Sequence, residues 1–137
     1  QHEIVPTVAA TFAAELAGRS WTPGRGRLML REPGYRLLPH LDSSNLLLTM
    51  LLYLPYPDSP PDSDGTILYT SRQPIRKRDV STHYLKLADA NEVGRIPYLP
   101  NTLVAFPNSL SALHGSVAST RRRRLYQWHL IDATSQP

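Results

Sequence analysis

The stretch Pro39-His40-Leu41-Asp42 places a histidine and an aspartate two residues apart, in a segment whose composition predicts a strand leading into a turn. Because residues two apart in an extended chain point to the same face, the imidazole of His40 and the carboxylate of Asp42 should lie side by side. Such a pair supplies two of the three protein ligands of a metal site, and our candidate for the third is His114, from a distant strand. The triplet alone carries little information, since about 0.4 His-x-acid triplets are expected by chance in this composition.

The composition is that of an ordinary globular chain. A length of 137 residues allows one core, so we expect a single domain over residues 1–137. Hydrophobic residues make up 41% of the chain and charged residues 19%, which argues against disorder throughout. The chain has no cysteine, which excludes disulfides, thiolate ligands and a cysteine nucleophile. A metal in this protein therefore needs histidine and carboxylate ligands.

The sequence predicts no membrane span and no secretion signal. The longest apolar run, at residues 46–54, is interrupted by Thr49 and falls far below the roughly 20 residues that cross a bilayer, so it predicts a buried strand. The amino terminus lacks the basic-then-apolar pattern of a signal peptide. We therefore expect a cytoplasmic protein.

The remaining pattern predicts one helix followed by short strands. Val8, Phe12 and Leu16 are spaced four apart among alanines, which predicts a helix over residues 6–18 that packs on the outside of a sheet. Apolar segments bounded by proline and glycine predict strands at residues 27–31, 46–54, 65–70, 102–106 and 122–130. We expect a surface loop at residues 56–64 and a long, partly ordered excursion at residues 71–94. Together these elements favour a mainly β fold, a jelly roll with an amino-terminal packing helix and a mouth that suits a small ligand.

Several short motifs match one known family in their order and spacing. They are Glu32-Pro-Gly-Tyr-Arg-Leu-Leu-Pro-His-Leu-Asp, Leu51-Leu-Tyr-Leu-Pro, Gly65-Thr-Ile-Leu-Tyr, Pro100-Asn-Thr-Leu-Val-Ala-Phe, Leu113-His-Gly and the basic last strand. As a set, covering residues 27–130, they resemble the Fe(II)/2-oxoglutarate-dependent dioxygenase superfamily, in particular its prolyl-hydroxylase-like branch.

The resemblance implies a fold, a cofactor and a reaction. The fold would be the double-stranded β-helix, a form of jelly roll, and His40, Asp42 and His114 would be the catalytic residues that hold Fe(II). The cosubstrates would be 2-oxoglutarate and molecular oxygen, and the enzyme would hydroxylate a small molecule or an amino-acid or peptide side chain with release of succinate and CO2. Two histidines and one carboxylate on one side of iron leave adjacent positions open for an oxo acid and oxygen, which fits this reaction.

By the same resemblance, a basic residue of the last strand pairs with the distal carboxylate of 2-oxoglutarate, and Tyr53 contacts it too. Strand alternation groups Arg122, Arg124, Tyr126 and Trp128 on one face and Arg121, Arg123, Leu125 and Gln127 on the other. The family spacing of about nine or ten residues after the second histidine favours Arg123 or Arg124, whereas the spacing of about six residues before a tryptophan favours Arg122. We predict Arg124 first and Arg122 second as the cosubstrate anchor, because both share a face with Trp128.

Two other functions stay open at this stage. One is a jelly-roll module that binds a metal or ligand without turnover, and the other is a dioxygenase directed to nucleic acid by the basic run at residues 121–124. Nucleic acid is disfavoured, because the run has no interleaved aromatic residue before Tyr126 and half of its arginines would face inward. We expect structural roles for His83 and His129, which have no partner at ligand spacing, and packing roles for Trp21 and Trp128.

Overall fold

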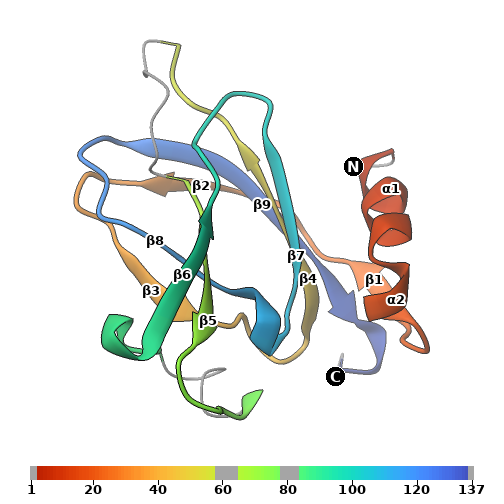
Figure 1. The fold of residues 1–137 in the computed structure, drawn as a ribbon. Helices are drawn as coiled ribbons and strands as arrows, with labels where there is room; N and C mark the ends of the chain where they lie inside the picture. The colour runs from red at the N-terminus through yellow and green to blue at the C-terminus, as the bar shows by residue number, and fades with distance from the viewer. Residues whose placement is uncertain (1–2, 58–64, 78–83, 136–137) are drawn as a thin grey trace.

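The computed structural model of the chain describes residues 3–57, 65–77 and 84–135, which form two antiparallel sheets. The larger sheet has the order β1-β9-β4-β7, and β2 pairs with the same edge of β9 as β1 does, further along the strand. Its strands are β1 (Trp21–Pro23), β2 (Arg27–Arg31), β4 (Leu46–Tyr53), β7 (Leu103–Pro107) and β9 (Arg123–Asp132). The smaller sheet has the order β3-β8-β5-β6. Its strands are β3 (Leu37–His40), β5 (Ile67–Ser71), β6 (Ala90–Arg95) and β8 (Leu113–Ser116). The result is a mainly β, jelly-roll-like fold, as the sequence predicts (Figure 1).

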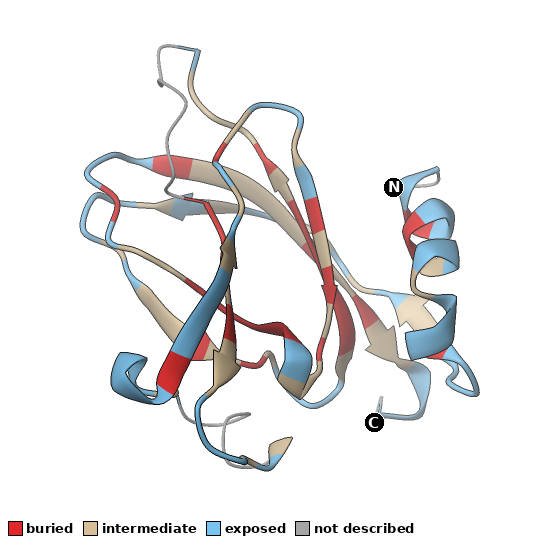
Figure 2. Cartoon of the chain, viewed as in Figure 1, coloured by how far each residue is buried: buried red, intermediate tan, exposed pale blue. Residues whose placement is uncertain are grey.

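The strand β4 lies in the middle of the larger sheet and is buried on both faces. It pairs with β9 on one side and β7 on the other, and Figure 2 shows most of it as buried. Leu48 and Met50 belong to a core cluster on the outer face, whereas Leu51 and Tyr53 pack with residues of β7 between the sheets. A strand of this kind reads as a nearly continuous apolar run, which explains why residues 46–54 were predicted correctly.

Two short helices cover the outer face of the larger sheet, on the side away from the smaller sheet (Figure 1). They are α1 (Ile4–Thr11) and α2 (Ala13–Leu16), separated at Phe12, where the backbone leaves the helical conformation. Val8 and Leu16 are buried against Trp128 and the β4 leucines, so the predicted packing is confirmed. The predicted single helix is wrong in its start, because Pro6 lies within the first turn of α1, where proline is tolerated, and in its continuity, because the backbone leaves the helical conformation at Phe12.

Short 3-10 turns precede β6 and β8 and follow β9. They are η1 (Leu87–Asp89), η2 (Leu110–Ala112) and η3 (Ala133–Ser135). Within the described residues, no helix is long and apolar enough to span a membrane.

Two strands fall where the sequence predicts none. Residues 90–95 form β6, which pairs with β5 at the edge of the smaller sheet, and residues 21–23 form β1. Most of β6 is exposed, so it lacks the apolar alternation that marks a half-buried strand. Most of the predicted loop at residues 56–64, from residue 58 on, lies outside the described residues, as does His83.

The turn two residues before β5 requires a glycine, Gly65, which gives a test of the fold. A Cβ atom on Gly65 would lie 1.8 Å from the backbone carbonyl oxygen of Ile96, whereas a Cβ atom on Gly94 would meet nothing within 4 Å. We expect Gly65→Ala to lower the free energy of unfolding by about 2 kcal/mol or more, because backbone on both sides must move. Urea denaturation measures this, with Gly94→Ala as the control, expected within about 0.5 kcal/mol of the wild type. Equal losses in the two variants would contradict the close approach of the two segments.

Candidate metal centre

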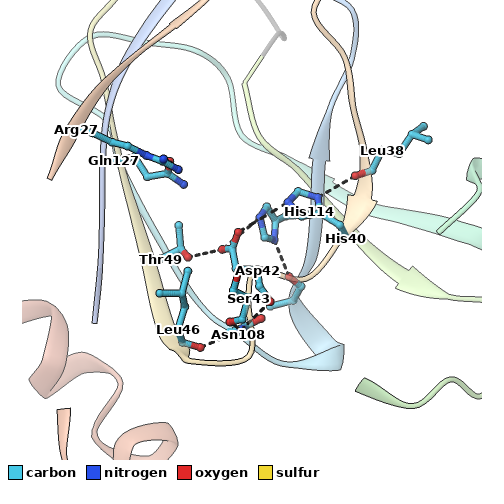
Figure 3. A network of polar contacts seen from close by, with 11 residues as sticks. Arg27, Leu38, His40, Asp42, Ser43, Leu46, Thr49, Asn108, His114 and Gln127 are labelled. Atoms are coloured by element: carbon cyan, nitrogen blue, oxygen red, sulfur yellow. Dashed lines mark hydrogen bonds and ion pairs between the residues drawn. The ribbon is translucent and has the colours of Figure 1, made fainter. Parts of the chain in front are cut away.

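Three potential metal ligands meet where the smaller sheet faces the larger one. His40 at the end of β3 is the cross-strand partner of His114 on β8, and Asp42 lies two residues after the end of β3. One ligand atom from each residue lies within 4.8 Å of the other two. The Nε2 atoms of His40 and His114 lie 3.8 Å and 3.7 Å from the two carboxylate oxygens of Asp42 (Figure 3). The structure thus brings together the three residues named from the sequence.

Backbone carbonyls fix the tautomers of both histidines. The Nδ1 atom of His40 lies 2.9 Å from the carbonyl oxygen of Leu38, and Nδ1 of His114 lies 3.3 Å from that of Ala112. A carbonyl oxygen only accepts hydrogen bonds, so each Nδ1 carries the proton and each Nε2 presents a lone pair. Hydrogen bonds of this kind orient the imidazoles of metal sites. Both Nε2 atoms therefore face Asp42 in the form that binds a metal.

The Asp42 carboxylate is held from the central strand. The hydroxyl of Thr49 on β4 donates a short hydrogen bond to Oδ2 of Asp42. The turn that follows Asp42 is fixed by Asn108, whose Nδ2 donates to the carbonyl oxygens of Asp42, Ser43 and Leu46 at 3.2, 2.8 and 2.9 Å. The sequence does not mark either supporting residue, because a threonine in an apolar run and an asparagine after a strand are common and carry no local signal of this role.

Burial keeps His114 neutral. The pKa of His114 is lowered to about 4, mainly by desolvation; the carboxylate of Asp42 opposes this shift and nearby His40 adds to it. A neutral imidazole is the form that coordinates a metal, so no proton needs to leave His114 near neutral pH. Two imidazoles and one carboxylate form a set that suits Fe(II) and leaves open positions.

The three residues open into a cavity of about 240 Å³ between the two sheets. One wall is the inner face of the larger sheet, where alternate residues of β4 and β9 line it. They are Thr49, Leu51, Tyr53, Arg123, Leu125 and Gln127. The metal centre lies beside Thr49, and the wall extends from there along β4 to Tyr53. A cavity with a cluster of ligands at one end and mixed apolar and polar walls is the usual form of a small-molecule site.

Of the arginines in the basic run at residues 121–124, Arg123 reaches the cavity, so the prediction of Arg124 or Arg122 is wrong in orientation. Arg123 is only 6% exposed and lines the cavity. Arg122 is exposed and pairs with Glu32 at 3.1 Å, and Arg124 donates to the carbonyl of Leu54 at 3.1 Å and lies over the ring of Tyr56. The prediction assumed that the face of β9 that carries Trp128 is the face that lines the cavity.

Trp128 instead packs against the helices on the outer face of the sheet. Both faces of β9 are covered along this part of the strand, so burial of the tryptophan does not mark the cavity side. The packing role predicted for Trp128 and Trp21 is confirmed, since both belong to the outer core cluster. His129 lies opposite Thr49 in the sheet and is not one of the three clustered ligands.

Tyr53 lies in the cavity wall, as its predicted role requires. Its hydroxyl donates to Oγ1 of Thr66 at 2.6 Å and accepts from the Thr66 N–H at 2.8 Å. Burial raises the pKa of Tyr53, while the positive charge of Arg123 lowers it, so Arg123 lies close enough to act on the phenol. Tyr98 fixes the neighbouring backbone by accepting the N–H of Arg124 at 2.8 Å. The cavity therefore has a rigid cationic end.

Comparisons with known proteins support the fold. No protein-family model matches the chain, and no curated protein matches it by sequence. Among solved structures, a prolyl-4-hydroxylase from Pseudomonas putida matches 95% of this chain with a TM-score of 0.58 and 17% identity. AviO1 from Streptomyces viridochromogenes matches 98% of it with a TM-score of 0.58 and 19% identity. The chain matches 62% and 60% of the length of those two proteins. The chain therefore shares the fold of these two proteins, and it carries a His-Asp-His cluster in the cavity.

The low pKa of His114 predicts a pH dependence of stability. The unfolded chain protonates this imidazole below about pH 6.5, whereas the folded protein keeps it neutral down to about pH 4. Between these values the unfolded state binds more protons, so the free energy of unfolding should fall as the pH falls, by up to about 3 kcal/mol from this group. Urea denaturation of the metal-free protein at several pH values measures the slope. His114→Gln should lose this part of it, and identical slopes in the two proteins would contradict the buried neutral state.

Proposed function

We propose that the protein is an Fe(II)- and 2-oxoglutarate-dependent oxygenase that hydroxylates a small molecule or an amino-acid or peptide side chain, with release of succinate and CO2. The observation that carries the proposal is the cluster of His40, Asp42 and His114 at one end of a cavity whose other end holds the buried Arg123. A cavity with a metal-binding cluster at one end and a buried arginine at the other suits an elongated diacid with one end at the metal.

His40, Asp42 and His114 would hold the iron. The Nδ1 atoms of the two histidines donate to backbone carbonyls and Thr49 donates to Asp42, and these hydrogen bonds orient the three ligands before metal binds. Iron bound with 2-oxoglutarate supplies the oxidation of a C–H bond by oxygen, coupled to loss of CO2 from the oxo acid. The work of the protein is to place the metal, the diacid and the substrate next to one another.

Arg123 would bind the distal carboxylate of 2-oxoglutarate. Its planar guanidinium can donate two parallel hydrogen bonds to a carboxylate, and its burial strengthens that pairing. Thr49 marks the metal end of β4, and Tyr53, on the same face four residues later, lies near Arg123. Leu51 and Leu125 form the apolar wall between the two ends. A five-carbon diacid laid along this wall would have a partner for each carboxylate.

The basic run at residues 121–124 does not form one surface. Arg123 faces the cavity, Arg122 pairs with Glu32, and Arg124 stacks on Tyr56. A nucleic-acid site needs cations that present a continuous stripe to phosphates. The arrangement therefore favours a small-molecule or side-chain substrate over a nucleic acid.

Removal of the carboxylate ligand tests the metal site. We expect Asp42→Ala to reduce Fe(II) affinity at least about 100-fold, because the site loses its only anionic ligand while the two imidazoles remain. Anaerobic titration with Fe(II), followed by the absorption change on addition of 2-oxoglutarate, measures this. Asp89→Ala removes an exposed aspartate of η1 and is the control. Unchanged iron affinity in a folded Asp42→Ala protein would rule out this site.

Replacement of the cavity arginine tests the cosubstrate site. We expect Arg123→Leu to weaken 2-oxoglutarate binding by about 2 to 5 kcal/mol, because the distal carboxylate loses its buried partner. Arg122→Leu should change this binding little, since that guanidinium is solvent-exposed. The measurement is the 2-oxoglutarate concentration dependence of succinate formation, with Arg123→Lys as a second variant that keeps the charge. Equal, small effects that vanish in high salt would place the cosubstrate anchor elsewhere.

A further inference from the structure

The edge strand β2 carries two arginines on the cavity side of the larger sheet, and the proposed function uses neither. Arg27 and Arg31 share one face of the strand and both line the cavity. Side chains alternate between the two faces of a strand, so Leu28 and Leu30 point to the opposite face, where both are exposed. The strand therefore turns its charge inward and its apolar side chains outward, the reverse of the usual pattern for a sheet that covers a core.

Arg27 is held in place by its cross-strand partner Gln127. The Nε and Nη2 atoms of Arg27 donate to Oε1 of Gln127 at 3.3 and 3.1 Å. Figure 3 shows both side chains extending from their strands toward the side of the sheet that holds Thr49 and Asp42. A guanidinium has five N–H donors, so this contact uses a minority of them and still restricts its orientation. Among the described residues, no carboxylate lies within 4 Å of Arg27.

The charges that line the cavity do not balance. Asp42 is the single carboxylate among the described lining residues, against Arg27, Arg31 and Arg123. In the proposed function, the two positive charges of Fe(II) and the charge of Arg123 would balance Asp42 and the two carboxylates of 2-oxoglutarate. Arg27 and Arg31 would then remain as uncompensated cations, and a cavity with low-dielectric walls concentrates such a potential on an incoming ligand.

The two arginines lie at different levels of the cavity. Arg27 pairs with Gln127, which pairs with Leu51, so the three lie in one row across the sheet, next to the row of Thr49. Arg31 is roughly 13 Å further along β2, opposite Arg123 and at the cosubstrate end. Its guanidinium lies 4.2 Å from the centre of the Tyr35 ring. Arg27 is therefore the uncompensated cation nearer to the metal centre.

An aromatic ring lies beside the metal centre on the other wall. The ring of Tyr84 contacts the edge of His40 at 5.4 Å between centroids and is 58% exposed. The next residue, Leu85, donates its N–H to the carbonyl of Pro39 at 2.8 Å, which fixes the segment against β3. An exposed ring next to a metal ligand offers an apolar surface to a substrate.

We infer that the substrate is a small carboxylic acid whose carboxylate is bound by Arg27 and whose apolar body lies against Tyr84. The inference rests on the proposed function for the role of the metal, but recognition of the acid by Arg27 requires no turnover. Gln127 is a positioning residue in this scheme, because it aims the guanidinium without carrying charge. Preorganisation of this kind raises affinity by reducing the ordering that binding requires.

The test compares matched acids and neutral amides. The probes are 3-phenylpropanoate with 3-phenylpropanamide, and hexanoate with hexanamide, titrated by calorimetry and by ligand-observed NMR at fixed ionic strength. The protein is the full chain, first metal-free and then with Mn(II) and 2-oxoglutarate, whose own binding is measured in the same series. The variants are Arg27→Leu, Arg27→Lys, Gln127→Leu and, as the control that removes an equal charge outside the cavity, Arg25→Leu.

The expected result is an acid that binds at least about tenfold more tightly than its amide, a preference lost in Arg27→Leu and kept in Arg25→Leu. Gln127→Leu should fall between the wild type and Arg27→Leu, and Arg27→Lys should retain part of the preference. The inference is overturned if acids and amides bind equally, if no acid binds at up to about 10 mM, or if Arg27→Leu matches the wild type. The inference is also overturned if Arg27→Leu weakens the binding of 2-oxoglutarate and leaves the binding of the acid probe unchanged.

Two further outcomes separate this inference from the proposed function. If Mn(II) and 2-oxoglutarate bind normally but the preference for acid over amide is unchanged in Arg27→Leu, the inference is wrong and the proposed function is unaffected. If Mn(II) and 2-oxoglutarate do not bind but binding of the acid still depends on Arg27, the proposed function is wrong and the carboxylate site at Arg27 is supported. Phenyl phosphate is a third probe for the shared chemistry of anions, and Arg27-dependent binding of it at least about tenfold tighter than the carboxylates would overturn the assignment to a carboxylic acid.

Discussion

The cross-strand pairing of His40 with His114 is the constraint on which the rest of the site depends. The two residues come from β3 and β8, and β8 is fixed on its other side by β5, where Leu68 is the partner of His114. A shift of one residue in either pairing would turn an imidazole to the opposite face of the sheet. Gly115 helps to fix the register, because a Cβ atom there would lie 2.5 Å from the carbonyl oxygen of Leu37. Only a strand without a side chain at this position lets β3 approach so closely.

The third ligand depends on the other sheet. Asp42 comes after β3, but its carboxylate is held by Thr49 of β4 and its turn by Asn108, which follows β7. The two histidines thus belong to the smaller sheet, while the supports of the aspartate belong to the larger one. The site forms only where the two sheets meet, so its geometry depends on how the two sheets pack against each other. The helices contribute indirectly, because they bury the outer face of β4 and so stabilise the strand that carries Thr49.

The charges of the cavity follow a simple arrangement. The buried histidine and the carboxylate lie at one end, a buried arginine lies at the other, and two more arginines lie along the open edge formed by β2. The two arginines of β2 are oriented by different neighbours, Arg27 by the side-chain amide of Gln127 and Arg31 by the ring of Tyr35. The cavity therefore combines a metal-binding end with cationic groups along β2 and β9 of the larger sheet.

The sequence by itself determined the β-rich pattern, the helix that covers the sheet and the three residues of the metal cluster. The strands and the helix follow from local periodicity, and the shared face of His40 and Asp42 follows from the alternation of an extended strand, whereas His114 as the third ligand follows from the family resemblance. It also placed Tyr53 in the cavity wall, through resemblance. Only the tertiary structure decided that Arg123, and not Arg124 or Arg122, faces the cavity. Alternation divides the residues of β9 into two faces, but both faces are buried, so the sequence cannot say which one looks inward. The supports from Thr49 and Asn108, and the exposed strand β6, were likewise decided by contacts between segments far apart in the chain, which leave no periodic signal in either segment.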